Sequence, residues 1–270
     1  MERKLAIPKN LFVFDIETIR DKELIASVKG RGKDTFEDIM ERERKRLKKE
    51  SIDDVFVATP YHKVVCISCL RKIGDKRTLK SWCGSEGKVL ETFWASIGVI
   101  LKEVTGDAPY IITFNGKRFD IPVITTRTLR YLDSFLSCEA DLQKHIDVAL
   151  NTYFSTKDKW ENKRPNYTNK YSRFNIDLIE HFGFGASLEA LCKICGIPVK
   201  SEGSGSEVEK YYLNGDYDRI ARYCAEDVRA TYALYLRMLL MHHAKDTYGE
   251  IKRELKNLES IRPEIKKLTH

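Results

Sequence analysis

The sequence predicts a globular domain built from both strands and helices, and three observations lead to this prediction. Short segments with strand character occur at 11–16, 63–70, 78–83 and 110–114. Longer segments carry apolar residues at helical spacing, at 88–104, 217–244 and 248–261. No internal repeat or clear linker interrupts the 270 residues. We therefore expect one domain over 1–245, followed by an amphipathic helical tail over 246–270.

A charged insertion is expected after the first strand, over residues 20–60. Its run EDIMERERKRLKKE at 37–50 favours a helix, with only Ile39, Met40 and Leu47 to bury. Six basic residues lie between positions 41 and 49. They fit a solvated helix face, or an arm that contacts phosphate groups.

A hairpin and a helix are expected next. Gly74-Asp75 predicts a tight turn between the strands at 63–70 and 78–83. The segment 88–104 then has the apolar spacing of a helix that packs one face on the sheet.

The fourth strand, at 110–114, leads into a turn and a helix. Asn115-Gly116 breaks the strand. Pro122 is favoured in the first turn of a helix, and we expect that helix to continue to about Leu132.

Two later helices are marked by their ends and their periodicity. Ser187 is a suitable N-cap and Gly196 a suitable stop for a helix over 187–195. A long helix over 217–244 carries an apolar stripe that includes Cys224.

The composition fits an intracellular, cytoplasmic protein. No segment approaches the roughly 20 apolar residues of a membrane span, and the first apolar run stops at Asp15, too soon for a signal peptide. We therefore expect no membrane partner. The net charge of +7 permits a polyanionic partner.

The seven cysteines form an odd number, which argues against a disulfide framework and favours a reducing compartment. Cys66 and Cys69 lie three apart in a strand, so they face opposite sides and cannot readily share a metal ion. Cys192 and Cys195 share a helix face with leucines, where small buried hydrophobic residues explain them better than a zinc site does.

A basic and aromatic segment, KDKWENKRPNYTNKYSRF, occupies residues 157–174. Basic groups that follow a phosphate chain, with rings on which bases stack, are typical of single-strand binding. An ordinary surface loop anchored by its aromatic residues fits the segment equally well. Trp160 and Tyr171 are the candidate stacking residues.

Carboxylates occur at three places where they call for an explanation. Asp15 and Glu17 lie two apart in the apolar first strand, so both side chains leave the same face. Asp120 stands where a strand and turn give way to a helix. Tyr223 and Asp227 lie four apart on the long helix and therefore share a face.

Four carboxylates gathered in one place would be costly unless cations offset their charge. Oxygen ligands suit Mg²⁺ and Mn²⁺, and two such ions about 3.5–4 Å apart can clamp the attacking and leaving oxygens of a phosphodiester. Each piece alone has a simpler interpretation: an acid pair at a strand end, Asp120 as an N-cap, and Tyr223 with Asp227 as a surface pair. The prediction rests on their order and contexts together.

These pieces resemble the three motifs of the DEDDy 3′–5′ exonucleases. The likeness is closest to the proofreading-type exonuclease domain of family-B DNA polymerases and its stand-alone bacterial relatives. The matching stretches are FDIET at 14–18, FNGKRFDIPV at 114–123 and YCAEDV at 223–228. KYSRFNIDLIEHFGFGASLEALCKICGIPVK at 170–200 is similar to the stand-alone branch. The resemblance covers roughly 8–19, 61–132 and 168–241.

The resemblance implies a ribonuclease H-like α/β fold, with a mixed central sheet of about five strands flanked by helices. It implies that Asp15 contacts both of two Mg²⁺ or Mn²⁺ ions. Glu17 and Asp227 would hold the ion that carries the nucleophilic water, and Asp120 would serve the other ion. Tyr223 would orient the water for in-line attack on the terminal phosphodiester.

The expected function is hydrolysis of single-stranded nucleic acid, preferably DNA, from its 3′ end to nucleoside 5′-monophosphates. Trimming of RNA 3′ ends, and a non-catalytic nucleic-acid-binding subunit of the same fold, are the alternatives. Candidate substrate contacts are Thr18, Asn115, Phe119, Trp160 and Tyr171. The resemblance to a proofreading domain points to replication or repair proteins as partners.

Two stretches compete to supply a further acid near the site. They are HID, ending at Asp147, and NIDL, which contains Asp177. Position in the chain favours Asp177, although Asn175 stands where the stand-alone branch tends to have histidine. We expect Asp177 to support the site without binding metal, or to be the N-cap of a helix at 179–182.

Overall fold

The computed structural model describes residues 7–103, 108–154, 167–169, 172–198, 207–242 and 248–268. The first half of the chain contains β1 (Asn10–Arg20), α1 (Lys22–Lys29), α2 (Phe36–Leu47), the 3₁₀ turn η1 (Thr59–Tyr61), β2 (His62–Ile73), β3 (Lys76–Gly84), α3 (Glu86–Glu103), β4 (Tyr110–Thr113) and α4 (Asp120–Leu136). The second half contains α5 (Ala140–Tyr153), β5 (Asn175–Asp177), α6 (Ile179–Phe182), α7 (Leu188–Ile194), α8 (Val208–Leu213), α9 (Tyr217–His242), α10 (Tyr248–Ser260) and β6 (Glu264–Leu268).

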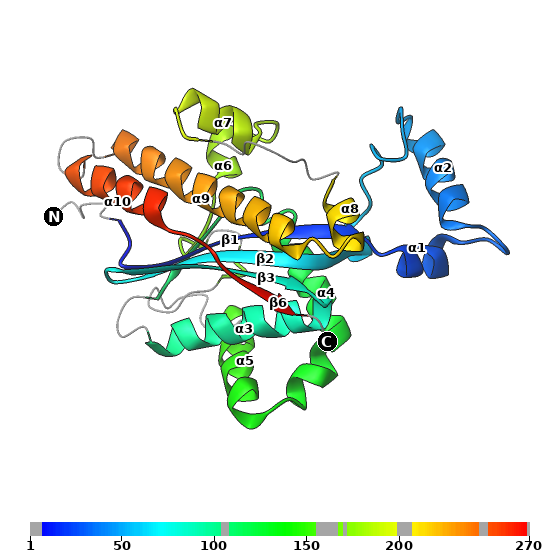
Figure 1. Ribbon diagram of the computed structural model, residues 1–270, viewed down its shortest axis with the longest axis horizontal. Coiled ribbons are helices and arrows are strands. Elements are labelled where there is room, and N and C mark those ends of the chain that lie inside the picture. The colour runs from blue at the N-terminus through cyan, green and yellow to red at the C-terminus, as the bar shows by residue number, and fades with distance from the viewer. Residues whose placement is uncertain are drawn as a thin grey trace.

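The described strands form one mixed sheet in the order β5-β4-β1-β2-β3-β6. β1, β2 and β3 are antiparallel neighbours, whereas β4, β5 and β6 each pair in parallel with the strand beside them. Helices α9 and α10 cover one face of the sheet, and α3 and α5 cover the other (Figure 1). The predicted mixed α/β architecture is therefore confirmed, with six strands where about five were expected.

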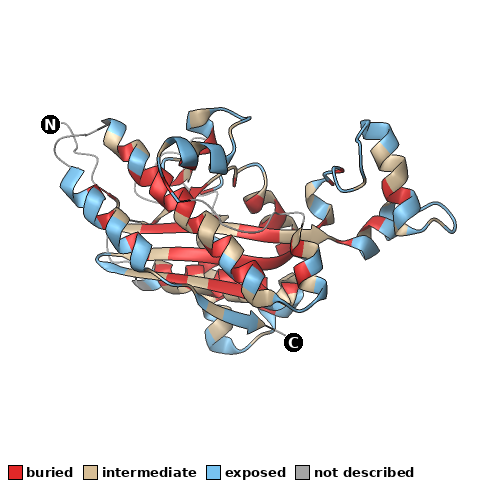
Figure 2. Cartoon of the chain, turned by 45° about the horizontal axis from the view of Figure 1, so that its top comes forward, coloured by how far each residue is buried: buried red, intermediate tan, exposed pale blue. Residues whose placement is uncertain are grey.

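The strand β1 divides the core by simple alternation. Leu11 and Val13 pack on the side of α9, while Phe12, Phe14 and Ile16 pack on the side of α3. Figure 2 shows buried residues running through the sheet and along the inward side of the helices. The acids of β1 follow the same alternation, which directs them toward α9.

Residues 21–61, here called the arm, extend beyond the end of β1 (Figure 1). Five buried residues form a small core within it: Ile25, Ile39, Met40, Val55 and Val57. Basic side chains of α2 pair inside the arm, Arg44 with Glu41 and Arg46 with Glu43. These pairs favour the solvated-face interpretation of the basic run, because its charges are largely matched locally.

A buried ion-pair network ties the arm to the rest of the domain. Arg127 of α4, whose side chain is 3% exposed, donates to both carboxylate oxygens of Glu86 at 2.8 and 2.5 Å and lies 2.8 Å from Asp21 Oδ2. Glu86 also accepts from the Val64 backbone at 2.7 Å and from the Tyr131 hydroxyl at 2.9 Å. One guanidinium therefore serves two buried carboxylates, and its removal would leave both without that partner.

The cysteines lie on the sheet and helix faces that the sequence predicts, but two of them form a disulfide that it does not predict. Cys66 and Cys83, which are opposite partners on β2 and β3, form a disulfide, so the expectation against disulfides is wrong at this pair. Cys69 faces the other side of the sheet, in the α3 core, as the strand period predicts. Cys192 and Cys195 pack in the apolar core beside α9, as expected for small hydrophobic residues.

The C-terminal segment packs on the sheet it follows. Ile251 and Leu258 of α10 are buried in the core beside α9, and β6 then pairs in parallel with β3, from Lys80 opposite Glu264 to Gly84 opposite Leu268. The sequence predicts α10 but not β6, whose residues EIKKL lack apolar alternation. Among the described helices, none combines the length and apolarity that a membrane crossing requires.

Candidate active site

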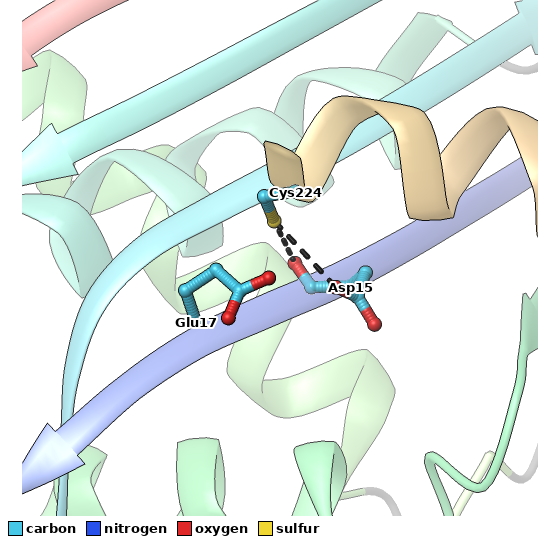
Figure 3. Close-up of side chains that lie close together, drawn as sticks. All are labelled: Asp15, Glu17 and Cys224. Atoms are coloured by element: carbon cyan, nitrogen blue, oxygen red, sulfur yellow. Dashed lines mark hydrogen bonds between the residues drawn. The ribbon is translucent and has the colours of Figure 1, made fainter. Parts of the chain in front are cut away.

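Asp15 and Glu17 project from β1 on the face that α9 covers. A carboxylate oxygen of each residue and the Sγ of Cys224 lie within 4.8 Å of one another (Figure 3). Glu17 is buried and Asp15 is half-buried. Two carboxylates at this separation repel each other, and a divalent cation is the partner that would offset their charge.

Cys224 of α9 lies against Asp15. Its Sγ is 3.3 Å from the Asp15 backbone oxygen and 3.7 Å from Asp15 Oδ2. Burial, followed by the charges of Asp15 and Glu17, raises the pKa of the Cys224 thiol well above its usual value. The thiol is therefore protonated and donates to Asp15, and a neutral thiol is a poor ligand for Mg²⁺. The sequence indicated only that Cys224 belongs to an apolar stripe, so this contact was missed.

Asp120 reaches β1 beyond the point where its pairing with β4 ends. That pairing stops at Val13 opposite Ile112, and farther along the strand the Ile16 backbone N–H donates to Asp120 Oδ1 at 3.2 Å. Asp120 is the first residue of α4 rather than its N-cap, so the N-cap alternative is wrong. Its carboxylate instead sits at the strand residue that separates Asp15 from Glu17.

The charges of further acids act on Asp120. Burial, and then the neighbouring carboxylates of Asp177 and Asp227, raises the pKa of Asp120 to about 7. Asp227 also contributes to the raised pKa of Cys224. The charge of Asp227 therefore disfavours the ionised forms of both Asp120 and the thiol that contacts Asp15. The donor set is rich in oxygen and negative charge, which fits a hard divalent cation.

Tyr223 and Asp227 lie one turn apart on α9, and both are half-buried. Tyr223 packs against the cluster that contains Cys224 and Cys83. The two residues therefore lie on the helix that covers the face from which Asp15 projects. Their roles in catalysis stay predictions.

The loop that carries Asp120 is held in place by Asp177. Asp177 accepts hydrogen bonds from the backbone N–H groups of Asn115 at 2.6 Å and Lys117 at 2.9 Å, and a longer one of 3.4 Å from Ile179. Its main contacts are thus with the loop rather than with the helix after it. The residue supports the loop of the second motif, as the sequence analysis expected of an acid near the site.

The Asn115-Gly116 turn has two local requirements. Asn115 adopts a left-handed backbone with φ of 64°, a conformation that asparagine tolerates better than most residues do. A Cβ on Gly116 would lie 2.4 Å from the Thr113 Cβ, so a side chain does not fit there. Asn115 therefore shapes the loop through its backbone.

Three other candidate residues are not among those described at the carboxylate site: Asp147, Trp160 and Tyr171. Asp147 lies on α5, which packs on the face opposite α9 (Figure 1), so it does not join the site. Trp160 and Tyr171, and most of the 157–174 segment, lie outside the described residues. Their role in substrate binding stays a prediction.

Thr18 and Phe119 meet at a histidine that the sequence analysis did not single out. The Thr18 hydroxyl lies 2.9 Å from His62 Nδ1, and His62 Nε2 lies 3.0 Å from the Val57 carbonyl oxygen. Burial lowers the pKa of His62, so the neutral ring donates from Nε2 and accepts the Thr18 proton at Nδ1. The Phe119 ring lies edge-on to His62 at 4.9 Å between centroids.

We expect Asp177→Asn to lower the rate of nucleotide release by roughly 10- to 100-fold, because an amide cannot accept from both loop N–H groups. The loop that carries Asp120 would then lose its fixed position. Single-turnover rates and Mn²⁺ titration would measure this, since loss of position should weaken Mn²⁺ binding too. Asp147→Asn, on the opposite face of the sheet, is the matched control. A rate and a Mn²⁺ affinity equal to wild type would rule out the supporting role.

A family model matches residues 54–267 of the chain, described as a predicted 3′–5′ exonuclease related to the exonuclease domain of PolB. The chain belongs to this exonuclease family. It is accordingly a nuclease domain, and exonuclease domains of this kind use divalent metals and bind nucleic acid 3′ ends. Among curated proteins, none matches the sequence significantly.

A solved structure shares the fold of this PolB-related exonuclease. The family B DNA polymerase from the hyperthermophilic archaeon Pyrobaculum calidifontis aligns with a TM-score of 0.50 and 16% sequence identity. The alignment covers 88% of this chain and only 25% of the polymerase. At this identity the similarity concerns the fold, and it fits the ribonuclease H-like architecture.

Proposed function

We propose that the protein is a metal-dependent 3′–5′ exonuclease that hydrolyses single-stranded nucleic acid, preferably DNA, to nucleoside 5′-monophosphates. The observation that supports this most is the gathering of Asp15, Glu17 and Asp120 around a short length of β1, in a chain of this family. Proteins of DNA replication or repair are the proposed partners.

Four carboxylates would hold two Mg²⁺ or Mn²⁺ ions: Asp15, Glu17, Asp120 and Asp227. The raised pKa of Asp120 supports this assignment, because burial, together with the charges of Asp177 and Asp227, disfavours its ionised form and a bound cation would offset this. When bound, such ions stabilise the negative charge that develops on the attacking and leaving oxygens.

The chain's own groups have distinct tasks in this proposal. The Tyr223 hydroxyl orients the attacking water through a hydrogen bond, and the thiol of Cys224 fixes the orientation of Asp15. The hydrogen bond from the Ile16 backbone to Asp120 holds the motif at 114–123 next to the motif at 14–18. Thr18 and Phe119 line the approach to the carboxylates and contact the terminal nucleotide.

Labelled oligonucleotides test the direction of cleavage. With Mg²⁺ or Mn²⁺, a 3′-labelled strand should release its label at once as a mononucleotide, while a 5′-labelled strand shortens stepwise. EDTA should stop both reactions, because the carboxylates cannot act without their cations. A circular single strand is the control and should stay intact, since it has no 3′ end. Cleavage of the circle would contradict exonuclease action.

Matched DNA and RNA strands decide the sugar preference. RNA differs at the 2′-hydroxyl, and faster release from RNA would favour the alternative of 3′-end trimming. Binding without release from either strand would favour the non-catalytic alternative.

A further inference from the structure

We propose that the arm supplies a base-stacking site for the single-stranded substrate, formed by the exposed ring of Phe56. The proposal rests on the proposed function, because the occupant it names is the 3′-terminal region of a single nucleic acid strand. Unpaired bases are apolar enough on their faces to stack on an aromatic side chain, whatever their identity.

Phe56 is exposed because its neighbours are not. Val55 and Val57 are buried in the arm's own core, so the side chain between them points away from that core. The Phe56 side chain is 69% exposed even though it contacts other rings. Exposure of a single apolar residue is common, so the argument depends on what holds the ring and where it lies.

The backbone on each side of Phe56 is fixed by the domain body. Arg20, the last residue of β1, donates to the Val55 carbonyl oxygen at 3.2 Å. His62, the first residue of β2, donates to the Val57 carbonyl oxygen at 3.0 Å. The ring is therefore presented by a segment that is ordered before any substrate binds, which lowers the entropic cost of stacking on it.

The ring of Phe56 contacts two rings that connect to the two carboxylate motifs. Its centroid is 4.9 Å from that of His62 and 5.5 Å from that of Phe119. His62 bonds to the hydroxyl of Thr18 in the first motif, and Phe119 immediately precedes Asp120 in the second. A strand whose 3′ end reaches the carboxylates would thus pass within reach of this ring.

A cavity of about 300 Å³ opens beside the rings of Phe56 and Phe119. Its lining includes three cationic side chains, Lys29, Arg46 and Arg118, against one carboxylate, Glu43. Phe56 therefore faces a space with an excess of positive charge. An aromatic surface flanked by cations suits a base attached to a phosphate chain better than it suits an uncharged apolar partner.

Binding of labelled strands to the full chain tests the proposal. Asp15→Asn serves as the background so that cleavage does not obscure binding, and fluorescence anisotropy of 5′-labelled oligo-dT and oligo-U gives the affinities. We expect Phe56→Ala to weaken binding by about tenfold and Phe56→Trp to preserve it. Tyr248→Ala is the control, because Tyr248 is 54% exposed on α10, at the end of the sheet opposite the arm (Figure 1).

Abasic strands locate the contact. Removal of one base among the last four nucleotides should weaken binding by about tenfold when the phenylalanine is present and have no further effect in Phe56→Ala. Equal losses in both proteins at every position would overturn the stacking site, as would an unchanged affinity of Phe56→Ala.

The two proposals fail separately. The stacking site alone would be overturned if the wild-type protein releases nucleotides while an abasic position still weakens binding to Phe56→Ala as much as to the protein with the phenylalanine. The exonuclease proposal alone would be overturned if the wild-type protein releases no nucleotides while an abasic position no longer weakens binding to Phe56→Ala. The stacking site would then remain supported.

Discussion

Asp15→Asn should reduce the single-turnover rate of nucleotide release by about a thousandfold or more. A carboxylate oxygen of Asp15 lies within 4.8 Å of a Glu17 carboxylate oxygen and of the Cys224 Sγ. The Cys224 thiol also contacts the Asp15 backbone oxygen. Replacement of one carboxylate oxygen by an amide nitrogen removes both a ligand and a negative charge. The chemistry depends on charge stabilisation in the transition state, so the loss should appear in the rate more than in the affinity for the strand.

Thermal unfolding offers a readout of the same change that does not require activity. Mn²⁺ should raise the unfolding temperature of the wild-type chain, since a ligand that binds only the folded state stabilises it. Asp15→Asn should show little or no such rise. Asp147→Asn should respond to Mn²⁺ as wild type does. A variant that keeps both a wild-type rate and the Mn²⁺ response would contradict the assignment of Asp15 as a ligand.

Arg127→Ala should lower the free energy of unfolding by about 3–5 kcal/mol. The guanidinium is buried between Glu86 and Asp21, and its loss would leave two buried carboxylates with reduced compensation. For a domain of this size the unfolding temperature should fall by roughly 10 °C. Urea or thermal denaturation followed by circular dichroism would measure the change.

A half-buried ion pair at the surface of the arm provides the control for Arg127. Arg44→Ala removes the pairing with Glu41 on the surface of α2 and should cost at most about 1 kcal/mol, because solvent screens such pairs. Similar losses in the two variants would show that the buried network has no special importance for stability.

The main elements of the sheet and its covering helices follow from local patterns in the sequence. A short run dense in Phe, Val and Ile predicts β1, which is buried on both faces. Helical spacing predicts α3, α9 and α10, each of which packs an apolar face on the sheet. Asp15 and Glu17 were singled out for a related reason: acids inside an apolar strand violate the local pattern and demand an explanation.

The parts that sequence reasoning missed depend on contacts between distant segments. β6 is polar and joins the sheet through backbone pairing with β3, which leaves no mark in side-chain periodicity. The hydrogen bond from Ile16 to Asp120 spans 104 residues, and no local signal distinguishes it from an N-cap. The contacts of Cys224 with Asp15 and of His62 with Thr18 are likewise consequences of how strand and helix meet.

The late position of β6 in the chain has a consequence for biosynthesis. β3 is made early, but the strand that covers its outer edge is synthesised about 180 residues later. On the ribosome, the nascent sheet therefore carries an unprotected edge from the synthesis of β3 until the synthesis of β6. Lys76 and Lys80 on β3 would discourage that edge from pairing with another nascent chain, since charged side chains oppose edge-to-edge association.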